Sequence, residues 1–143
     1  MFTMSTLGKS SILFPMIALA TLTFAVLLLI PLRRFRAGFA GKVAMDDFKY
    51  GESARVPPEV CIPNRNMMNL LELPLLFYVA CLVYLVIGPV DSVALVLAWL
   101  YVGLRAVHSA IHVTYNRVRH RLTAFALSNV VLVMFWTNLI RPL

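Results

Sequence analysis

The chain has 143 residues, of which 61% are hydrophobic and only 13% are charged, about half the charged share of a soluble domain. A mean hydropathy of +0.84 excludes a disordered chain and an ordinary soluble domain. The net charge of +7 comes from basic residues that flank apolar runs. This pattern favours a membrane protein and argues against nucleic-acid binding. Two cysteines are too few for a disulfide framework, and neither has the spacing of a metal ligand.

Four apolar segments, each about as long as one bilayer crossing, predict transmembrane helices. They cover residues 12–32, 67–87, 93–113 and 122–140. Arginines follow the first segment directly, which is typical of a membrane span rather than a cleaved signal peptide. The connection 33–64 is too polar to span, so we expect a long loop there. The sequence therefore predicts an all-α integral membrane protein, a four-helix transmembrane bundle that forms one domain over residues 1–143.

Basic residues are unevenly distributed between the two sides of this bundle. With four spans, the first and third connections share one side, and that side carries most of the basic residues: Arg33, Arg34, Arg36, Lys42, Lys49, Arg55, Arg65, Arg117, Arg119 and Arg121. Only Lys9 and Arg141 fall on the opposite side. The positive-inside rule therefore predicts cytoplasmic basic loops and two extracytoplasmic termini.

Polar side chains interrupt the second and third spans at helical spacing. A charge inside a span costs about 2.5–3.5 kcal/mol on insertion scales, so each one needs a partner or a function. Two stripes have this character, one on each helix: Arg65, Asn69 and Glu72, and Arg105, His108 and His112. The second helix leaves the cytoplasmic side and the third returns to it, so both stripes fall in the same half of the bilayer. We expect them to line a polar cleft that opens to the cytoplasm.

Such a cleft suits a small anion with several acceptor groups, because arginine binds carboxylates in a two-point geometry. A carboxylate such as Glu72 would hold an ammonium group, and the helices would admit an apolar molecule from the lipid. Two other interpretations stay open. Glu72 and Arg105 could form a structural ion pair with Asn69 bridging the helices, or the titratable residues could relay protons or ions. The two histidines lack a third ligand for a metal, so we expect no metal site.

Short motifs around these stripes resemble a known family. The motifs are Pro57-Pro58-Glu59-x5-Arg65-x3-Asn69-x2-Glu72, Arg105-x2-His108-x3-His112, Phe48-x2-Gly51-Glu52, and the spacing from His112 to Arg121 with Phe125 four residues on. They are similar to segments of the MAPEG family, the membrane-associated proteins of eicosanoid and glutathione metabolism. Within that family they resemble microsomal glutathione transferase most. The resemblance covers roughly residues 33–125, with the same four-span hydropathy at both ends.

This resemblance implies a homotrimer that binds glutathione, as co-substrate, between neighbouring subunits at the cytoplasmic side. It assigns contacts with glutathione to Arg33, Arg65, Asn69, Glu72, Arg105, His108 and His112. It also implies that Arg121 lies near the sulfur, where a guanidinium lowers the pKa of the thiol and stabilises the thiolate nucleophile. The thiolate would attack a lipophilic small-molecule electrophile or reduce a lipid hydroperoxide.

Two positions differ from the family's pattern. His112 stands where a third-helix tyrosine is expected, and Leu73 follows Glu72 where the leukotriene-synthesising branch has tyrosine. Both differences argue against eicosanoid synthesis, so the function that the resemblance implies is a glutathione-dependent transferase or peroxidase. Because some members resemble binding scaffolds more than enzymes, a non-catalytic scaffold for a lipid or amphiphile is the alternative function.

Overall fold

The structure is a computed structural model that describes residues 8–87 and 90–141. This part of the chain folds into α1 (Leu13–Phe39), α2 (Pro58–Leu71), α3 (Pro74–Ile87), α4 (Ser92–Val113) and α5 (Val118–Ile140), with the short 3-10 helices η1 (Lys9–Ile12) and η2 (Met45–Phe48). Within the described residues, four stretches are long and apolar enough to cross a membrane: Lys9–Phe39, Pro58–Ile87, Ser92–Val113 and Val118–Ile140. The predicted all-α, four-span architecture is confirmed.

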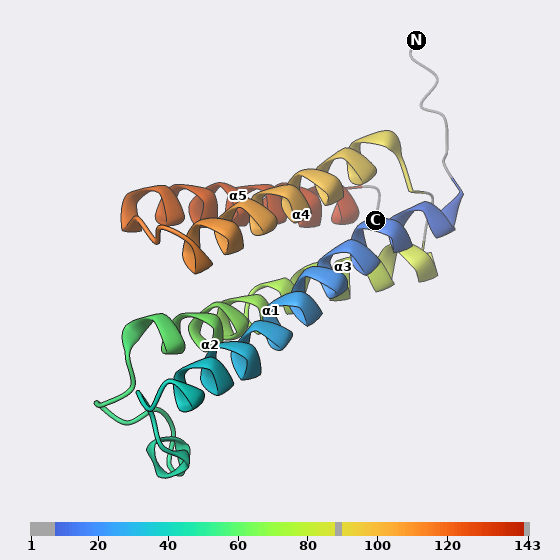
Figure 1. Ribbon diagram of the computed structural model, residues 1–143. Helices are drawn as coiled ribbons and strands as arrows, with labels where there is room; N and C mark the ends of the chain where they lie inside the picture. Colours follow the sequence, from blue (N-terminus) through green and yellow to red (C-terminus); the bar gives the residue numbers. More distant parts are fainter. Residues whose placement is uncertain (1–7, 88–89, 142–143) are drawn as a thin grey trace.

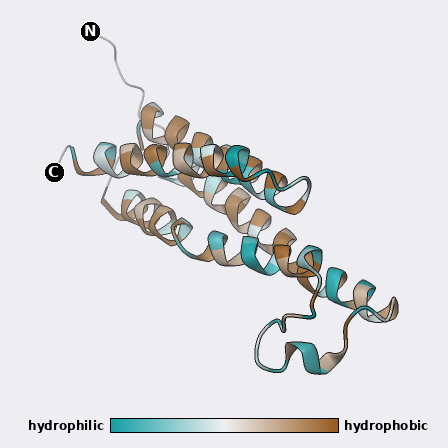
Figure 2. Ribbon diagram, turned by 90° about the vertical axis from the view of Figure 1, so that its left-hand side faces the viewer, coloured by the Kyte–Doolittle hydropathy of each residue, from teal (hydrophilic) through white to brown (hydrophobic). Residues whose placement is uncertain are grey.

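The helices form two layers, with α4 and α5 side by side over α1, α2 and α3 (Figure 1). An aromatic cluster joins the layers: the Phe77 ring lies 4.8 Å from the Tyr101 ring and 5.5 Å from the Phe135 ring, centroid to centroid. Hydrophobic residues cover most of the helical surface, and hydrophilic ones gather at the α1–α2 loop and in the adjoining half of the helices (Figure 2). The two layers thus share a buried apolar core.

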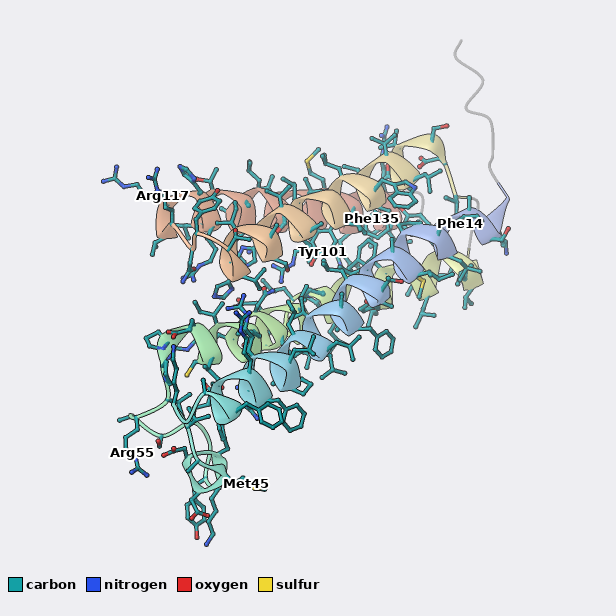
Figure 3. The ribbon with its side chains drawn as sticks, in the orientation of Figure 1. Phe14, Met45, Arg55, Tyr101, Arg117 and Phe135 are labelled. Carbon is teal, nitrogen blue, oxygen red and sulfur yellow. The ribbon has the colours of Figure 1, made fainter. Side chains whose placement is uncertain are left out.

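The α1–α2 loop and the α4–α5 turn lie at the same end of the molecule. Figure 3 shows Met45 and Arg55 on the loop and Arg117 beside the turn, all at one end, whereas Phe14 lies at the other. The start of α1 and the end of α5 also lie at that other end (Figure 1). The basic residues of the two connections therefore gather at one end of the bundle.

The loop predicted at residues 33–64 is too long. α1 continues to Phe39, so Arg33, Arg34 and Arg36 lie on a helix, and α2 already begins at Pro58. Proline is favoured in the first helical turn because its missing N–H would be unpaired there anyway. The connection that remains is residues 40–57. The fourth span likewise begins at Val118, four residues before the predicted start.

The second span predicted over residues 67–87 lies within the longer membrane-spanning stretch Pro58–Ile87, and its helix is interrupted. The chain begins this span at Pro58, breaks after Leu71 and resumes as α3 at Pro74. Pro74 has no N–H for the carbonyl four residues earlier, and its ring disfavours helical geometry in the preceding residue. Glu72 therefore follows the end of α2 instead of lying on it, with φ −78° and ψ −98°.

The loop 40–57 is organised around one carboxylate. Asp47 accepts hydrogen bonds from the Ala44 N–H and the Ser53 hydroxyl, both at 2.9 Å, and forms an ion pair with Arg55. These interactions, that of the Ala44 N–H first, hold the pKa of Asp47 below its usual value of 3.8. The loop is thus a folded segment rather than a linker.

Asp91 is the N-cap of α4, which begins at Ser92. Its Oδ1 accepts a hydrogen bond from the Ala94 N–H at 2.6 Å. The pair Gly88-Pro89 is a sequence typical of a turn, and it lies outside the described residues.

Candidate functional site

The polar stripe of α4 is buried inside the bundle. Arg105 has an exposed fraction of 0%, and His108 and His112 of 3% each. All three lie on the face of α4 that packs against α2 and α5. The predicted spacing of the stripe is confirmed, and the burial means that each polar atom needs a hydrogen-bond partner.

Arg105 caps the broken end of α2. Its Nη2 donates a hydrogen bond to the Asn69 carbonyl, which lies in the last turn of α2. The last carbonyls of a helix lack partners within it, and a cation is favourable at that end of the helix dipole. The guanidinium also lies 5.7 Å from the centre of the Phe125 ring. Its Nε and Nη1 have no hydrogen-bond partner within the described residues.

His108 connects α4 to the first turn of α5. Its Nδ1 lies 3.1 Å from the Arg121 carbonyl oxygen. Because a carbonyl only accepts, Nδ1 carries the hydrogen and Nε2 of the neutral ring is an acceptor. Nε2 of His108 and Nδ1 of His112 have no partner within the described residues. The two imidazole rings lie 5.7 Å apart.

Arg121 is held by the turn that precedes its helix. Its Nη1 donates to Asn116 Oδ1 at 2.7 Å. Asn116 has φ 47°, and its N–H bonds the Ile111 carbonyl at 2.8 Å, which closes the end of α4. Sequence reasoning missed Asn116. The available signal was an asparagine just after a helical run, a residue type that tolerates this left-handed conformation.

Helices α2, α4 and α5 enclose a cavity of about 190 Å³ at this point. Its walls are Asn69, His108, Val118, Arg121, Leu122 and Phe125. Three residues predicted from sequence, Asn69, His108 and Arg121, are thus brought to one cavity from three helices. Val118 and Leu122 supply an apolar side.

Arg65 and Glu72 lie on the surface of the subunit. Asn69, between them in sequence, lines the cavity, and its Nδ2 donates to the Arg65 carbonyl at 2.9 Å. The structural ion pair between Glu72 and Arg105 is not formed. The ion pairs within residues 8–87 and 90–141 are Arg34–Glu52 and Arg55–Asp47.

Arg33 does not line this cavity but joins three helices. Its Nη1 donates to the Glu59 carbonyl and its Nη2 to the Val113 carbonyl, each at 3.4 Å. The Glu59 carbonyl lies four residues before Pro63, which has no N–H to offer it. Val113 is the last residue of α4, and its carbonyl is free because the last carbonyls of a helix have no partner within it. Arg33 therefore satisfies two backbone acceptors.

A comparison of the chain with known protein families gives one match. The profile of the MAPEG family covers residues 12–141. The chain belongs to the MAPEG family. Neither the curated proteins nor the solved structures contain a match. Membership agrees with a multi-pass membrane protein of glutathione-related or eicosanoid metabolism.

The MAPEG chain has a second polar link between α2 and α4 that sequence reasoning missed. The Ser109 hydroxyl donates to Asn66 Oδ1 at 3.2 Å, and both side chains are buried. Asn66 Nδ2 has no partner within the part of the chain that the structure describes. The interior beside the cavity thus offers several hydrogen-bonding groups that the subunit does not use. Among the described residues, no group of three or more His, Cys, Asp or Glu could hold a metal ion.

Proposed function

We propose that this MAPEG chain is a glutathione-dependent transferase or peroxidase that acts on lipophilic electrophiles. One observation carries the proposal: a cavity that holds Arg121 and His108 lies beside a fully buried Arg105 with two unpartnered guanidinium nitrogens. A buried donor without a partner costs about 1–3 kcal/mol, so an arrangement of several such groups favours a ligand that satisfies them.

The unpartnered groups fit the chemistry of glutathione. Its carboxylates would accept from Arg105 and from the exposed Arg65, and Glu72 would hold its ammonium group. His108, His112 and Asn69 would bond its amides. Arg33, which contacts only backbone in this subunit, would serve by fixing the ends of α2 and α4.

The size of the cavity supports a site shared between copies. Pockets that enclose a small molecule usually measure about 300–1,000 Å³, and the cavity of one subunit is about 190 Å³. A homotrimer would complete it at the face where Arg65 and Glu72 are exposed. The lipid around the trimer would deliver the apolar co-substrate to the same face.

The chemistry follows from Arg121. Its guanidinium would lower the pKa of the glutathione thiol and hold the thiolate, which is the reactive nucleophile. In transfer, the thiolate sulfur bonds the electrophilic carbon and the leaving group departs with its electron pair. In peroxide reduction, two glutathione thiols and one hydroperoxide give a disulfide, an alcohol and water.

The basic end of the bundle would face the cytoplasm, where glutathione is abundant. Ten basic residues on the α1–α2 and α4–α5 side support this orientation under the positive-inside rule. A cysteine introduced in place of Lys49 should react with a membrane-impermeant thiol reagent only from the cytoplasmic side. Labelling from outside would contradict the orientation.

Substitution of Arg121 tests the function directly. Glutathione binding to purified protein is measured by calorimetry, and thiolate formation by ultraviolet difference absorbance. We expect Arg121→Ala to lower turnover and thiolate formation by about 10²-fold, the usual cost of removing a group that stabilises developing negative charge, while much of the binding remains.

Arg119→Ala is the matched control, because Arg119 lies in the same first turn of α5 but is exposed and outside the cavity. It should behave as the wild type. Binding without any turnover in the wild type would favour the scaffold alternative. No binding of millimolar glutathione would reject the proposal.

A further inference from the structure

A second and larger cavity, of about 780 Å³, lies between the end of α1 and the folded loop. It forms because η2 turns back toward the last two turns of α1. Its walls are almost entirely apolar and include Pro31, Phe35 and Phe39 from α1, and Val43, Met45 and Phe48 from the loop. This cavity shares no lining residue with the cavity of Asn69 and Arg121.

The cavity lies at the level where the apolar run of α1 gives way to arginines. It begins at Ile30, inside the run, and extends past Arg34 to the loop. Phe39 and Met45 at its rim have exposed fractions of 92% and 93%. Large apolar side chains at a membrane boundary are stable when they contact lipid instead of water. We therefore expect the opening of this cavity to face the lipid of the bilayer.

Arg34 supplies the polar side of the cavity. Its Nη2 pairs with Glu52 Oε1 at 3.2 Å, and its guanidinium lies 4.5 Å over the centre of the Phe48 ring. These contacts fix the side chain, which nevertheless stays about one-third exposed, so part of the guanidinium can still meet a ligand. A donor that is held in place beside an apolar cavity suits an amphiphile with an acceptor on its headgroup.

We propose that this cavity binds an anionic phospholipid of the adjacent leaflet. One acyl chain occupies the apolar space between α1 and η2, and the phosphate accepts from the exposed part of the Arg34 guanidinium. Exposed Lys42 and Lys49 on the same loop add attraction for an anionic headgroup, about 1 kcal/mol for each basic residue near the surface. The site is separate from the glutathione site and does not depend on it.

Gly38 allows the cavity to be filled without strain. It lies on α1 and lines the cavity, and a Cβ added to it would meet nothing within 4 Å. Gly38→Leu therefore places a side chain in the open space and also favours the helix. Gly103→Leu is the matched control, since Gly103 is a helical glycine with equally open surroundings on α4, outside this cavity.

The test uses the full chain in phosphatidylcholine vesicles that contain a small share of phosphatidylglycerol with a photoactivatable group in its acyl chain. After irradiation, adducts are mapped by mass spectrometry. We expect adducts on residues 30–48 in the wild type and in Gly103→Leu. In Gly38→Leu they should fall about tenfold, because the leucine takes the place of several acyl methylenes. Arg34→Gln should lower them several-fold.

Three results would overturn the proposal. Equal labelling of Gly38→Leu and the wild type would show that the lipid lies elsewhere. Equal labelling by the same photoactivatable group on phosphatidylcholine would show that the cavity does not select an anionic headgroup. Cross-links between residues 30–48 of two copies, without lipid adducts, would show that a second copy of the chain covers this face.

Discussion

Asn116 combines an unusual backbone conformation with a side-chain contact to Arg121. We expect Asn116→Gly, which keeps φ 47° but removes the acceptor, to lower thiolate formation about tenfold by releasing Arg121. Asn116→Ala loses the same contact and also puts alanine in the left-handed region, which alanine tolerates less well than asparagine. We therefore expect its free energy of unfolding to fall by about 1–2 kcal/mol, and its unfolding temperature to fall with it. Thiolate absorbance and thermal unfolding measure the two effects.

The glycine variant is decisive for the role of the side chain. If Asn116→Gly forms thiolate as readily as the wild type, the hydrogen bond does not position Arg121. If the glycine and alanine variants are equally stable, the left-handed backbone of the turn is not what the asparagine provides.

The protonation of Asp47 should determine how the stability of the loop 40–57 changes in acid. Its pKa in the folded loop is lower than the usual 3.8, chiefly because the Ala44 N–H bonds the carboxylate. Its contribution is therefore complete above pH 3.8 and is lost as the pH falls through the lower folded value. We expect Asp47→Asn to speed amide hydrogen exchange of Ala44 at neutral pH, with the difference from wild type disappearing in acid. A difference that persists unchanged in acid would assign the effect to shape rather than charge.

The sequence predicted which site residues share a helix face, because such residues recur at helical spacing. The spacing of Arg105, His108 and His112 predicted one face, and the structure confirms it. What they contact was not predictable, because Arg105 bonds the Asn69 carbonyl that the break after α2 leaves free, and His108 bonds the Arg121 carbonyl in the first turn of another helix. A side-chain pattern alone does not show which carbonyls are left without a partner.

At the scale of elements, proline residues create the acceptors that two arginines use. Pro63 frees the Glu59 carbonyl for Arg33, and the break before Pro74 leaves the Asn69 carbonyl for Arg105. Each arginine is thereby fixed by a carbonyl that α2 leaves without a partner. The helix interruptions thus help to position the polar residues.

Pro74→Ala tests this connection. Alanine restores the missing N–H, so we expect residues 72–74 to become helical and the Leu73 N–H to compete for the Asn69 carbonyl. Arg105 would lose its acceptor, and the protein should be destabilised by about 1–3 kcal/mol although its helicity rises. Circular dichroism and thermal unfolding measure the two quantities.

Pro31→Ala is the control, because α1 remains one helix through Pro31. It should leave the bonds of Arg105 unchanged. A Pro74→Ala protein that is more stable than the wild type would contradict this prediction, because it would show that the hydrogen bond of Arg105 to the broken end of α2 does not stabilise the fold.

Hydropathy predicted the number of spans because the apolar length needed to cross a bilayer is nearly constant. It missed the break at Glu72 because the leucines around Pro74 keep the average apolar while the backbone changes direction. It also ended the first span at Leu32, although arginines are good helix formers and continue α1 to Phe39. Composition locates spans, whereas local backbone chemistry determines their limits.

At the scale of the molecule, two exposed charged residues of the second membrane-spanning stretch support the proposed trimer. Arg65 and Glu72 are exposed, although both lie within the membrane-spanning stretch Pro58–Ile87 that contributes Asn69 to the cavity of about 190 Å³. Contact with lipid would leave both charges without partners. The neighbouring copy of the proposed trimer would remove them from lipid and enlarge the cavity.

Oligomer mass and glutathione affinity should therefore change together. In mild detergent we expect particles with the mass of three 16.1 kDa chains, measured by native mass spectrometry, that bind glutathione. A harsher detergent that dissociates them should lower the affinity at least about tenfold while circular dichroism still reports folded helices, because each subunit retains only part of the site. Monomers that bind glutathione as tightly as the trimer would contradict the shared site. Arg65→Ala should weaken binding in the trimer and have little effect on the dissociated subunit, since Arg65 contributes only where a second copy encloses the ligand.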